Sequence, residues 1–253
     1  MISNGELIQL VSPQGKKYIR KLDIQSELHT HDGKIAFKDI IDLEFGDSIN
    51  THLGVPYVVL KPTLYEIIKS IDRRTQIIYP KDIGYILLRL GIGPGTQVVE
   101  AGCGSGGLTT ALAYMVGDNG RVYAFDRRED FVNLCKNNLK KVGLDVRVSF
   151  FLKDIESGFD VKDMDTGFLD VREPWNYIDQ FASAVKNGSE VGFLVPTANQ
   201  VIKLIKALEK GPYVDIDVVE ILLRRYKAVA ERFRPDDRMV AHTGFLIFAR
   251  VKM

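Results

Sequence analysis

The feature that most constrains the fold is a glycine-rich turn between a short apolar run and a segment with helical spacing. The run Val98-Val99-Glu100 leads into residues 101–107, which include four glycines. From Leu108 onward, through Leu112 and Met115, apolar side chains recur at helical spacing. The pattern predicts a strand that enters a helix through a loop with almost no side chains. Such a loop exposes backbone N–H groups at the positive end of a helix dipole, where an adenosine-containing cofactor would be held.

The spacing of these glycines fits two classes of cofactor. Gly102, Gly104 and Gly107 match the G-x-G-x-x-G dinucleotide fingerprint, and Asp126 follows about 20 residues later, as a ribose-binding acid should. Read from Glu100, the same loop also matches E-x-G-x-G-x-G, the first motif of class I methyltransferases that use S-adenosylmethionine. The loop alone therefore leaves a nicotinamide enzyme and a methyltransferase both open.

Composition sets wide bounds on the protein. With 253 residues, 45% of them hydrophobic and 26% charged, the chain can form one large domain, or one large and one small. It has no apolar run long enough for a membrane span and no signal region at the start, so we expect a cytoplasmic protein. Cys103 and Cys135 lack the spacing of a disulfide framework or a metal site, and both are expected to be reduced. A net charge of +1 neither demands nor excludes a nucleic-acid partner.

The first part of the chain, residues 1–62, predicts a small β domain. A turn signal at Ser12-Pro13-Gln14-Gly15 is typical of a connection between short strands. Seven Lys/Arg stand against eight Asp/Glu, so charge count does not make this domain a nucleic-acid clamp. Three histidines are expected in polar turns, where local hydrogen bonding is favoured over metal binding because no third ligand has suitable spacing: His29, His31 and His52. The strands are expected at 7–11, 17–22, 34–37 and 57–60.

Residues 63–74 predict a connector with a short helix at 64–71, and residues 75–253 predict the cofactor-binding domain. Residues Ile83 to Leu90 have the spacing of an amphipathic helix. Just ahead of this helix, Gln76 and Tyr79 would lie near the glycine loop, although an extended strand with a packed tyrosine explains them equally well.

From residue 97, strands and helices alternate, which predicts a mainly parallel, doubly wound sheet of the α/β class, with ligands at the carboxyl ends of the strands. Pro174 is expected in the first turn of a helix that carries Ile178, Phe181 and Val185 inward. The expected strands are 97–101, 121–126, 146–152, 166–170 and 190–196, and the other expected helices are 105–116, 129–142 and one that begins near Thr197.

The end of the chain predicts an antiparallel hairpin. Residues 215–222 and 242–251 both have the character of strands, and no helical pattern separates them. The excursion at 224–240 holds six Lys/Arg against three acids, with Tyr226 and Phe233 interleaved. A solvated loop and a nucleic-acid surface account for this composition equally well.

Four acids end the first four predicted strands of this sheet, and their carboxylates would meet in one crevice. We expect Asp126 to bind the ribose hydroxyls, Asp154 the adenine amino group, and Glu100 to lie near the charged methionine end of S-adenosylmethionine. A nicotinamide enzyme gives Asp154 and Asp170 no particular role, so these acids favour the methyltransferase. Further cofactor contacts are predicted in and just after the loop, at Ser105, Gly106 and Leu108, and at Phe131, for which a helix-core role is an equal alternative.

The stretch from Asp170 to Trp175 predicts the site of the methyl acceptor. An aromatic ring beside Pro174 makes a flat wall for a base, and the carboxylate can accept a hydrogen bond from an exocyclic amino group. This combination suits adenine. The structural alternative is a helix cap in which Asp170 and Pro174 begin the helix and Trp175 lies in the core.

Taken together, these motifs resemble the TrmI family of tRNA (adenine-N1)-methyltransferases, especially its archaeal members. The resemblance spans the chain and rests on the small N-terminal β domain, the glycine loop and five further segments: Gln76-Ile77-Ile78-Tyr79-Pro80-Lys81-Asp82, Phe125 to Phe131, Asp170 with Pro174-Trp175, Arg234-Pro235, and His242-Thr243-Gly244-Phe245. Asp126 stands where relatives often have Glu, a change that a ribose contact should tolerate.

The resemblance implies methyl transfer from S-adenosylmethionine to N1 of adenine 58 in the tRNA T-loop, with position 57 also possible, by a homotetramer and without a metal. Adenine N1 would attack the sulfonium methyl group directly and in line. Asp170 would accept a hydrogen bond from the N6 amino group of this adenine and stabilise the positive charge that develops on the ring. Contacts to the substrate are expected from Tyr79, Pro174, Trp175, Arg234 and His242. Two rivals stay open: a class I methyltransferase for another acceptor, such as protein isoaspartate or a corrinoid precursor, and a noncatalytic tRNA-binding subunit.

Overall fold

The computed structural model describes residues 1–74 and 76–252. Thr75 and Met253, the first and last residues of the predicted cofactor-binding domain, lie outside the described residues. The chain divides into two compact units: residues 1–71 with 140–143, and residues 72–139 with 144–253. Within the described residues no helix combines the length and the apolar character that a membrane crossing requires.

The first unit is built on a four-stranded antiparallel sheet in the order β2-β1-β6-β5. Strand β6 shows why these residues form a sheet. Tyr57 and Val59 are buried, while Pro56, Val58 and Leu60 are exposed, which is the period-two alternation of a strand with one buried face. The strands are β1 (Leu7–Val11), β2 (Lys17–Lys21), β5 (Ser48–Asn50) and β6 (Pro56–Leu60), and a separate ladder pairs β3 (Glu27–Thr30) with β4 (Gly33–Ala36), after which comes η1 (Phe37–Asp39).

The sequence missed β3 and β5, which are short and largely polar. The expectation that His29 sits in a turn is therefore wrong, because His29 lies in β3. Its local partner is Glu27, 2.6 Å away, and His31 likewise meets Asp32 at 3.1 Å. His52 does lie in a turn, where its Nδ1 accepts a hydrogen bond from the Lys34 backbone at 2.8 Å.

Helix α1 (Leu64–Ser70) belongs to this first unit and begins with a complete capping box between Thr63 and Glu66. The Glu66 carboxylate also accepts hydrogen bonds from Lys17 at 2.6 Å and from the buried Gln9 at 3.0 Å. These bonds, Lys17 first, lower the pKa of Glu66 to about 2. One carboxylate thus ties the start of the helix to strands β1 and β2.

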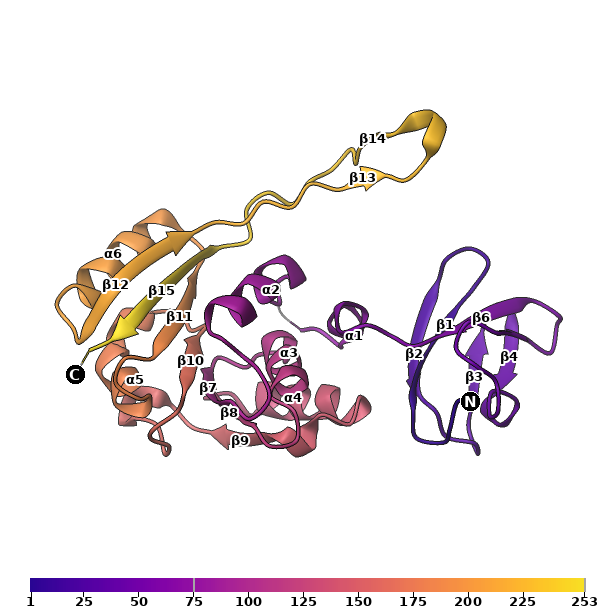
Figure 1. Cartoon of the computed structure of the whole chain (residues 1–253), viewed down its shortest axis with the longest axis horizontal. Coiled ribbons are helices and arrows are strands. Elements are labelled where there is room, and N and C mark those ends of the chain that lie inside the picture. The colour runs from indigo at the N-terminus through magenta and orange to yellow at the C-terminus, as the bar shows by residue number, and fades with distance from the viewer. Residues whose placement is uncertain (75, 253) are drawn as a thin grey trace. The chain divides into compact units, whose positions relative to one another are not determined.

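The second unit contains a seven-stranded sheet in the order β12-β15-β11-β10-β7-β8-β9, shown in Figure 1. The ladders from β11 to β9 are parallel, and β15 is antiparallel to both of its neighbours. This confirms the predicted doubly wound sheet with a terminal antiparallel hairpin. The strands are β7 (Gln97–Ala101), β8 (Arg121–Asp126), β9 (Val148–Leu152), β10 (Thr166–Leu169), β11 (Glu190–Val195), β12 (Tyr213–Val219) and β15 (Phe245–Val251).

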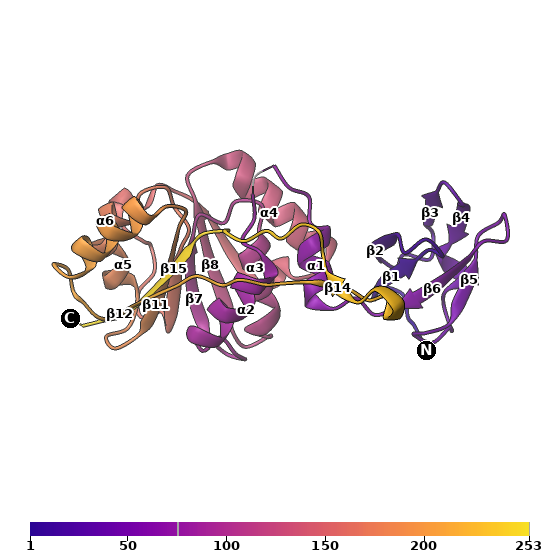
Figure 2. The same ribbon diagram turned by 90° about the horizontal axis from the view of Figure 1, so that it is seen from above.

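Helices cover both faces of this sheet, with α2, α3 and α4 on one side and α5 and α6 on the other (Figures 1 and 2). The second group buries Phe181 and Leu204 against sheet residues such as Val99 and Phe193. The helices are α2 (Pro80–Arg89), α3 (Gly107–Met115), α4 (Glu129–Lys141), α5 (Ile178–Ala184) and α6 (Ala198–Leu208), with short 3-10 turns η2 (Asp145–Arg147), η3 (Ile155–Ser157) and η4 (Pro174–Asn176).

One predicted helix is divided. Pro174 begins the 3-10 turn η4, and Tyr177, at φ −124° and ψ 10°, separates it from α5. Val185 is buried as predicted but follows the helix as an extended residue. The non-helical backbone of Tyr177 explains why one continuous helix does not form from Pro174.

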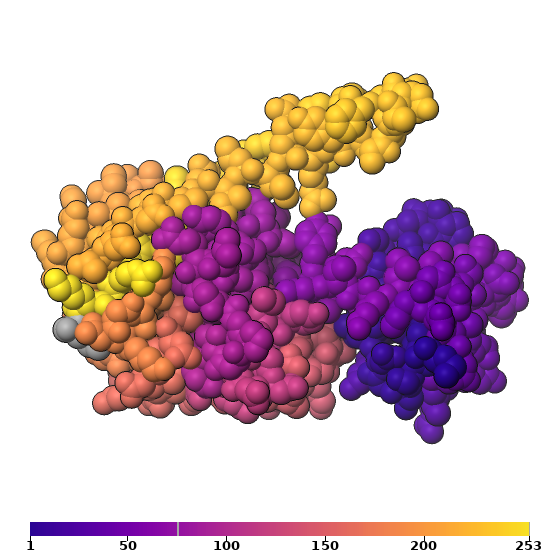
Figure 3. Space-filling model, in the orientation of Figure 1, coloured from indigo at the N-terminus to yellow at the C-terminus, as the bar shows by residue number. Residues whose placement is uncertain are grey.

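Between β12 and β15 the chain leaves the sheet as a long two-stranded arm, residues 220–244, drawn in yellow in Figure 3. Its ladder pairs β13 (Tyr226–Lys227) with β14 (Arg234–Pro235), with η5 (Ala230–Arg232) at the tip. The Tyr226 and Phe233 rings stack, with their centroids 5.1 Å apart. The predicted strands 215–222 and 242–251 were too long toward the arm, because β12 ends at Val219 and β15 begins at Phe245.

Candidate functional site

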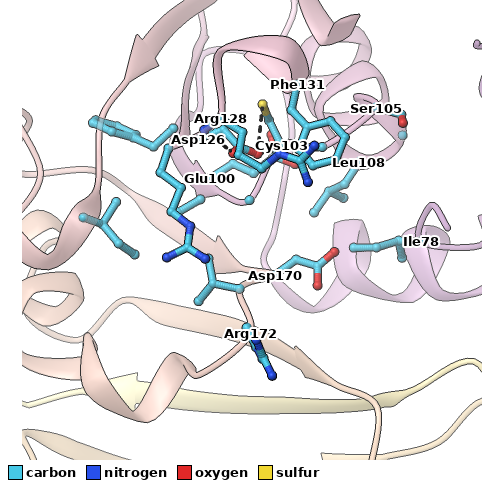
Figure 4. A pocket seen from close by; sticks show the side chains of 18 of the residues that line it. Ile78, Glu100, Cys103, Ser105, Leu108, Asp126, Arg128, Phe131, Asp170 and Arg172 are labelled. Atoms are coloured by element: carbon cyan, nitrogen blue, oxygen red, sulfur yellow. Dashed lines mark hydrogen bonds between the residues drawn. The ribbon is translucent and has the colours of Figure 1, made fainter. Parts of the chain in front are cut away.

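A cavity of about 500 Å³ opens at the carboxyl ends of β7, β8 and β10, where the strand order reverses (Figure 4). This position, at the topological switch point, is where doubly wound sheets bind ligands, and the volume lies in the range of small-molecule sites. Ten residues predicted from the sequence as cofactor contacts line the cavity: Gln76, Glu100, Gly102, Gly104, Ser105, Leu108, Asp126, Phe131, Asp154 and Asp170.

The glycine loop is fixed between the two strands that flank β7. The Gly102 N–H donates to Phe125 O on β8 at 2.9 Å, and the Asp170 N–H donates to Ala101 O at 2.9 Å. Gly102 has φ +88°, and a Cβ there would lie 2.0 Å from the Asp170 carbonyl oxygen. Only glycine fits this position, so the loop and the end of β10 are packed in direct contact.

Asp126 ends β8 and holds the loop from the other side. Its carboxylate accepts hydrogen bonds from the Gly104 N–H at 3.1 Å and the Arg128 N–H at 3.0 Å. Figure 4 also shows the Cys103 thiol directed at this carboxylate, with 3.9 Å between the sulfur and the oxygen. The Arg128 guanidinium lies 3.9 Å from the centre of the Phe131 ring, which lines the cavity. Asp126 therefore orders the loop as well as facing the cavity.

Glu100 is the most deeply buried acid of the cavity, with 2% of its surface exposed. Burial first, together with the nearby carboxylates of Asp170 and Asp126, raises its pKa to about 8. Its Oε2 atom has no hydrogen-bond partner among the described residues. A buried acceptor without a donor beside a cavity fits a cationic ligand group, and the ammonium of S-adenosylmethionine is such a group.

Asp170 follows β10, and its carboxylate projects into the cavity (Figure 4). Burial first, and then the charge of Asp126, raise its pKa from 3.8 to about 7. A carboxyl group whose pKa lies near neutrality can gain or lose a proton in the working range of an enzyme, so Asp170 is the strongest candidate for chemistry at this site.

Asp154 and Gln76 lie at the edges of the cavity. The Asp154 side chain caps η3 by accepting a hydrogen bond from the Glu156 N–H at 3.0 Å, and it approaches Arg127 at 3.9 Å. Gln76 donates to the Tyr79 hydroxyl at 2.7 Å. Tyr79, the residue before α2, is adjacent to the cavity lining rather than part of it, because the lining continues only to Ile78.

Several predicted contacts lie outside the cavity. Gly106 adopts φ +86° as the residue before α3 and supports the loop without lining it. Pro174 is buried, and Trp175 packs against the core with the Lys203 ammonium 4.3 Å from its ring centre. Trp175 is thus partly buried against the core, close to the structural alternative, and is not among the residues that line the cavity.

The two basic candidates lie on the arm. Arg234 is in β14 and pairs with Asp237. His242 lies at the root of the arm, where its ring nitrogens meet Glu220 and the Pro196 carbonyl, each at 2.7 Å. Neither residue lines the cavity.

Sequence reasoning missed Arg127, Arg172 and Tyr177, which also line the cavity. Arg127 and Arg172 each stand within two residues of a predicted acid, so proximity to Asp126 and Asp170 was the available signal. Tyr177 had no signal, because its place depends on the break between η4 and α5.

Comparisons with known proteins agree with this geometry. A family described as tRNA methyltransferase complex GCD14 subunit matches residues 56–236, and the TrmI-like N-terminal family matches residues 1–54. A relative from Methanocaldococcus jannaschii, named tRNA (adenine(57)-N(1)/adenine(58)-N(1))-methyltransferase TrmI, is 33% identical over 96% of this chain and 94% of its own.

Two solved structures are similar over the full length of the chain. The tRNA (m1A58) methyltransferase TrmI from Aquifex aeolicus is 40% identical, with a TM-score of 0.81, and covers 100% of this chain and 99% of its own. A structure from Thermotoga maritima, described as a SAM-dependent O-methyltransferase, is also 40% identical, with a TM-score of 0.88, and covers 100% of this chain and 95% of its own.

Proposed function

The chain belongs to the TrmI family of tRNA methyltransferases, and from this premise we propose that it methylates N1 of adenine in the T-loop of tRNA. Position 58 is the target we propose first, because the M. jannaschii relative and the A. aeolicus structure both carry it in their names. Position 57 is proposed as a second target on the ground that the M. jannaschii relative is named for both. The methyl donor is S-adenosylmethionine.

One observation carries the proposal: the Asp170 carboxylate, with its pKa near 7, projects into the cavity beside the glycine loop. An adenine presented at this point can donate a hydrogen bond from its N6 amino group to the carboxylate. The ionised carboxylate then stabilises positive charge that develops on the ring as N1 is methylated. Asp170 acts by electrostatics and orientation, and no covalent bond to the enzyme is needed.

The residues on the other side of the cavity are suited to hold S-adenosylmethionine, which supplies an activated methyl group when bound. The backbone of the glycine loop can receive its methionine end, with Glu100 as the partner of its ammonium group. Asp126, which already accepts two backbone N–H bonds, has lone pairs left for ribose hydroxyls. Asp154 is assigned the adenine amino group of the cofactor, since it lines the same cavity.

Partner and location follow from this function as proposals. tRNA is the substrate, and the enzyme would act in the cytoplasm. A homotetramer is proposed from the family resemblance alone.

The test is transfer of a labelled methyl group to unmodified tRNA, followed by nucleoside analysis. We expect 1-methyladenosine, and a tRNA with guanine at position 58 should lose the label from that position. Wild-type protein and Asp170→Asn should be compared on the same tRNA, because the variant keeps the shape of the side chain and lowers its capacity as an acceptor.

Two other outcomes would contradict the proposal. Label in a 2′-O-methyl nucleoside would favour the activity stated for the T. maritima structure. Tight binding of tRNA and S-adenosylmethionine without any transfer would favour a noncatalytic subunit.

A further inference from the structure

A buried polar cluster joins helix α2 to the root of the arm. It consists of Lys81, Asp82 and Thr243, and we call it the Lys81 clamp. The side chains of Lys81 and Asp82 are 7% and 2% exposed. The Lys81 ammonium donates three hydrogen bonds: to Asp82 at 2.7 Å, to Thr243 Oγ1 at 2.6 Å and to the Ile221 carbonyl at 2.7 Å. The Thr243 hydroxyl donates to the other Asp82 oxygen at 2.8 Å.

The position of Lys81 works against the stability of its own helix. It is the second residue of α2, where the positive end of the helix dipole disfavours a cation. Burying an ammonium also costs solvation free energy that an ion pair offsets only when all its hydrogen bonds are made. All three donors of Lys81 are satisfied, two of them by residues about 140 and 162 positions away in sequence. The clamp therefore holds two distant segments together. A helix that began without a buried cation would avoid the solvation free energy that this arrangement costs.

The segment that the clamp holds is the one that borders the cavity. Tyr79 precedes α2 and lies two residues from Lys81, and Gln76, bonded to the Tyr79 hydroxyl, lines the cavity. On its other side, Ile77 packs against the start of α3, where a Cβ on Gly107 would lie 3.1 Å from the Ile77 Cβ. The segment 76–79 thus runs between two fixed points: the glycine loop with α3, and the clamp.

The root of the arm, where residues 220–221 and 242–244 leave the sheet, is in turn fixed to the carboxyl end of β11. His242, next to Thr243, contacts both Glu220 and the carbonyl of Pro196, which directly follows β11. The clamp consequently connects the carboxyl end of β11 to the segment that carries Tyr79.

We propose that Lys81 is a positioning residue for methyl transfer: through the clamp it fixes the segment 76–79, in which Gln76 lines the cavity and donates a hydrogen bond to the Tyr79 hydroxyl. Lys81 itself does not line the cavity. The inference rests on the proposed function for its kinetic test, but its structural test does not depend on activity.

The kinetic test is a double-mutant cycle of Lys81→Met and Tyr79→Phe, measured as methyl transfer to tRNA. Each single change should lower kcat by about tenfold, because small displacements of orienting groups are costly in catalysis. The double variant should be little worse than either single variant, since Tyr79→Phe removes the hydroxyl whose position Lys81→Met disturbs. Losses that multiply, or an unchanged kcat in either single variant, would overturn the proposal.

A matched control lies at the other end of the same helix. Arg89 also joins α2 to the sheet, through Glu190 at 2.6 Å and Asp217 at 2.7 Å, but it does not line the cavity. Arg89→Met should lower Tm to a similar extent as Lys81→Met while leaving kcat within about twofold of the wild type. Equal kinetic losses in both variants would reduce Lys81 to a stabilising residue and contradict the proposal.

The test that is independent of activity is hydrogen exchange. The N–H groups of Asp82 and Ile83 both donate to the Tyr79 carbonyl, so they report the order of the segment. Lys81→Met should speed exchange over residues 76–83 and 220–223 and leave strands β7 and β8 protected. Thr243→Val should reproduce this change and Thr243→Ser should not. If the wild type transfers no methyl to tRNA but shows this exchange pattern, the proposed function fails and the clamp stands; unchanged exchange overturns the clamp.

Discussion

The two sides of the cavity are built from the chain in different ways. The side that we propose for the cofactor comes mainly from residues 100–131, a strand, a loop, a helix and the next strand in unbroken order. The side that we propose for the acceptor has Asp170 and the segment 76–78, which the Lys81 clamp ties to the root of the arm near residues 221 and 243. The first side is thus a local product of sequence, while the second exists only after distant segments have packed together.

This difference explains what each side can tolerate. In the loop the backbone itself would contact the cofactor, so this side requires particular φ angles and residues without side chains. The acceptor side instead requires that long-range contacts place carboxylate, hydroxyl and ammonium groups correctly. Changes to the first side should act on cofactor affinity, and changes to the second on turnover.

The largest effect is expected where the two sides meet, at Gly102. Gly102→Ala places a Cβ 2.0 Å from the Asp170 carbonyl and forces an L residue to φ +88°, so the loop and β10 must separate. We expect the affinity for S-adenosylmethionine, measured by calorimetry, to fall by more than about a hundredfold. Tm should fall by about 6 °C or more, as strain of about 3 kcal/mol implies for a chain of this size.

The control for this variant is Gly188→Ala. Gly188 has a similar φ of +83° but nothing within 4 Å of its Cβ, so only the conformational cost applies. Gly188→Ala should lower Tm slightly and leave cofactor affinity unchanged. If both variants bound the cofactor normally, the contact between loop and β10 would not matter for binding.

The second prediction separates the two sides directly. Asp170→Asn should lower kcat by about a hundredfold, because the group that stabilises charge in the transition state is neutralised, and should change the cofactor Kd by less than about threefold. Asp126→Asn should do the reverse and raise Kd by about tenfold, since its carboxylate orders the loop through the Gly104 and Arg128 N–H groups. Equal effects of both changes on Kd would mean that the two sides are one site.

The same contrast shows how far the sequence could be read. The glycine loop, β7, β8 and the four acids were correctly predicted in position because turn residues and strand ends are local signals. The terminal hairpin was also predicted, from two apolar runs with no helical pattern between them. In contrast, the division between η4 and α5 at Tyr177 and the two distant partners of Lys81 at the root of the arm could not be read from spacing.

The third prediction concerns pH. With the pKa of Asp170 at about 7, kcat/KM should fall about tenfold per pH unit below 7 and level off above it. The limb should be absent in Asp170→Asn. A profile of the same shape in that variant would assign the limb to another group.

The raised pKa of Asp170 should also make the stability of the folded protein depend on pH. Because the folded pKa is raised from 3.8, the native state keeps a proton that the unfolded chain releases, so stability present below pH 4 is lost as pH rises through 7. Asp170→Asn should therefore raise Tm at pH 8 by about 2–4 °C and leave it unchanged near pH 4. A lower Tm at pH 8 would show that the partly buried charge of Asp170 does not destabilise the folded state.

The smallest effect is expected at Trp175, which the sequence offered as a wall for the base. Its ring packs against the core, with the Lys203 ammonium over one face of the ring. Its indole Nε1 is buried without a hydrogen-bond partner among the described residues. Trp175→Phe should therefore cost about 1–2 kcal/mol, seen as a fall in Tm of a few degrees, with the KM for tRNA changed by less than about twofold. A KM raised tenfold at unchanged Tm would instead make Trp175 a contact to the base. The acceptor side would then extend beyond the cavity, and the division between a local cofactor side and an assembled acceptor side would need a third element.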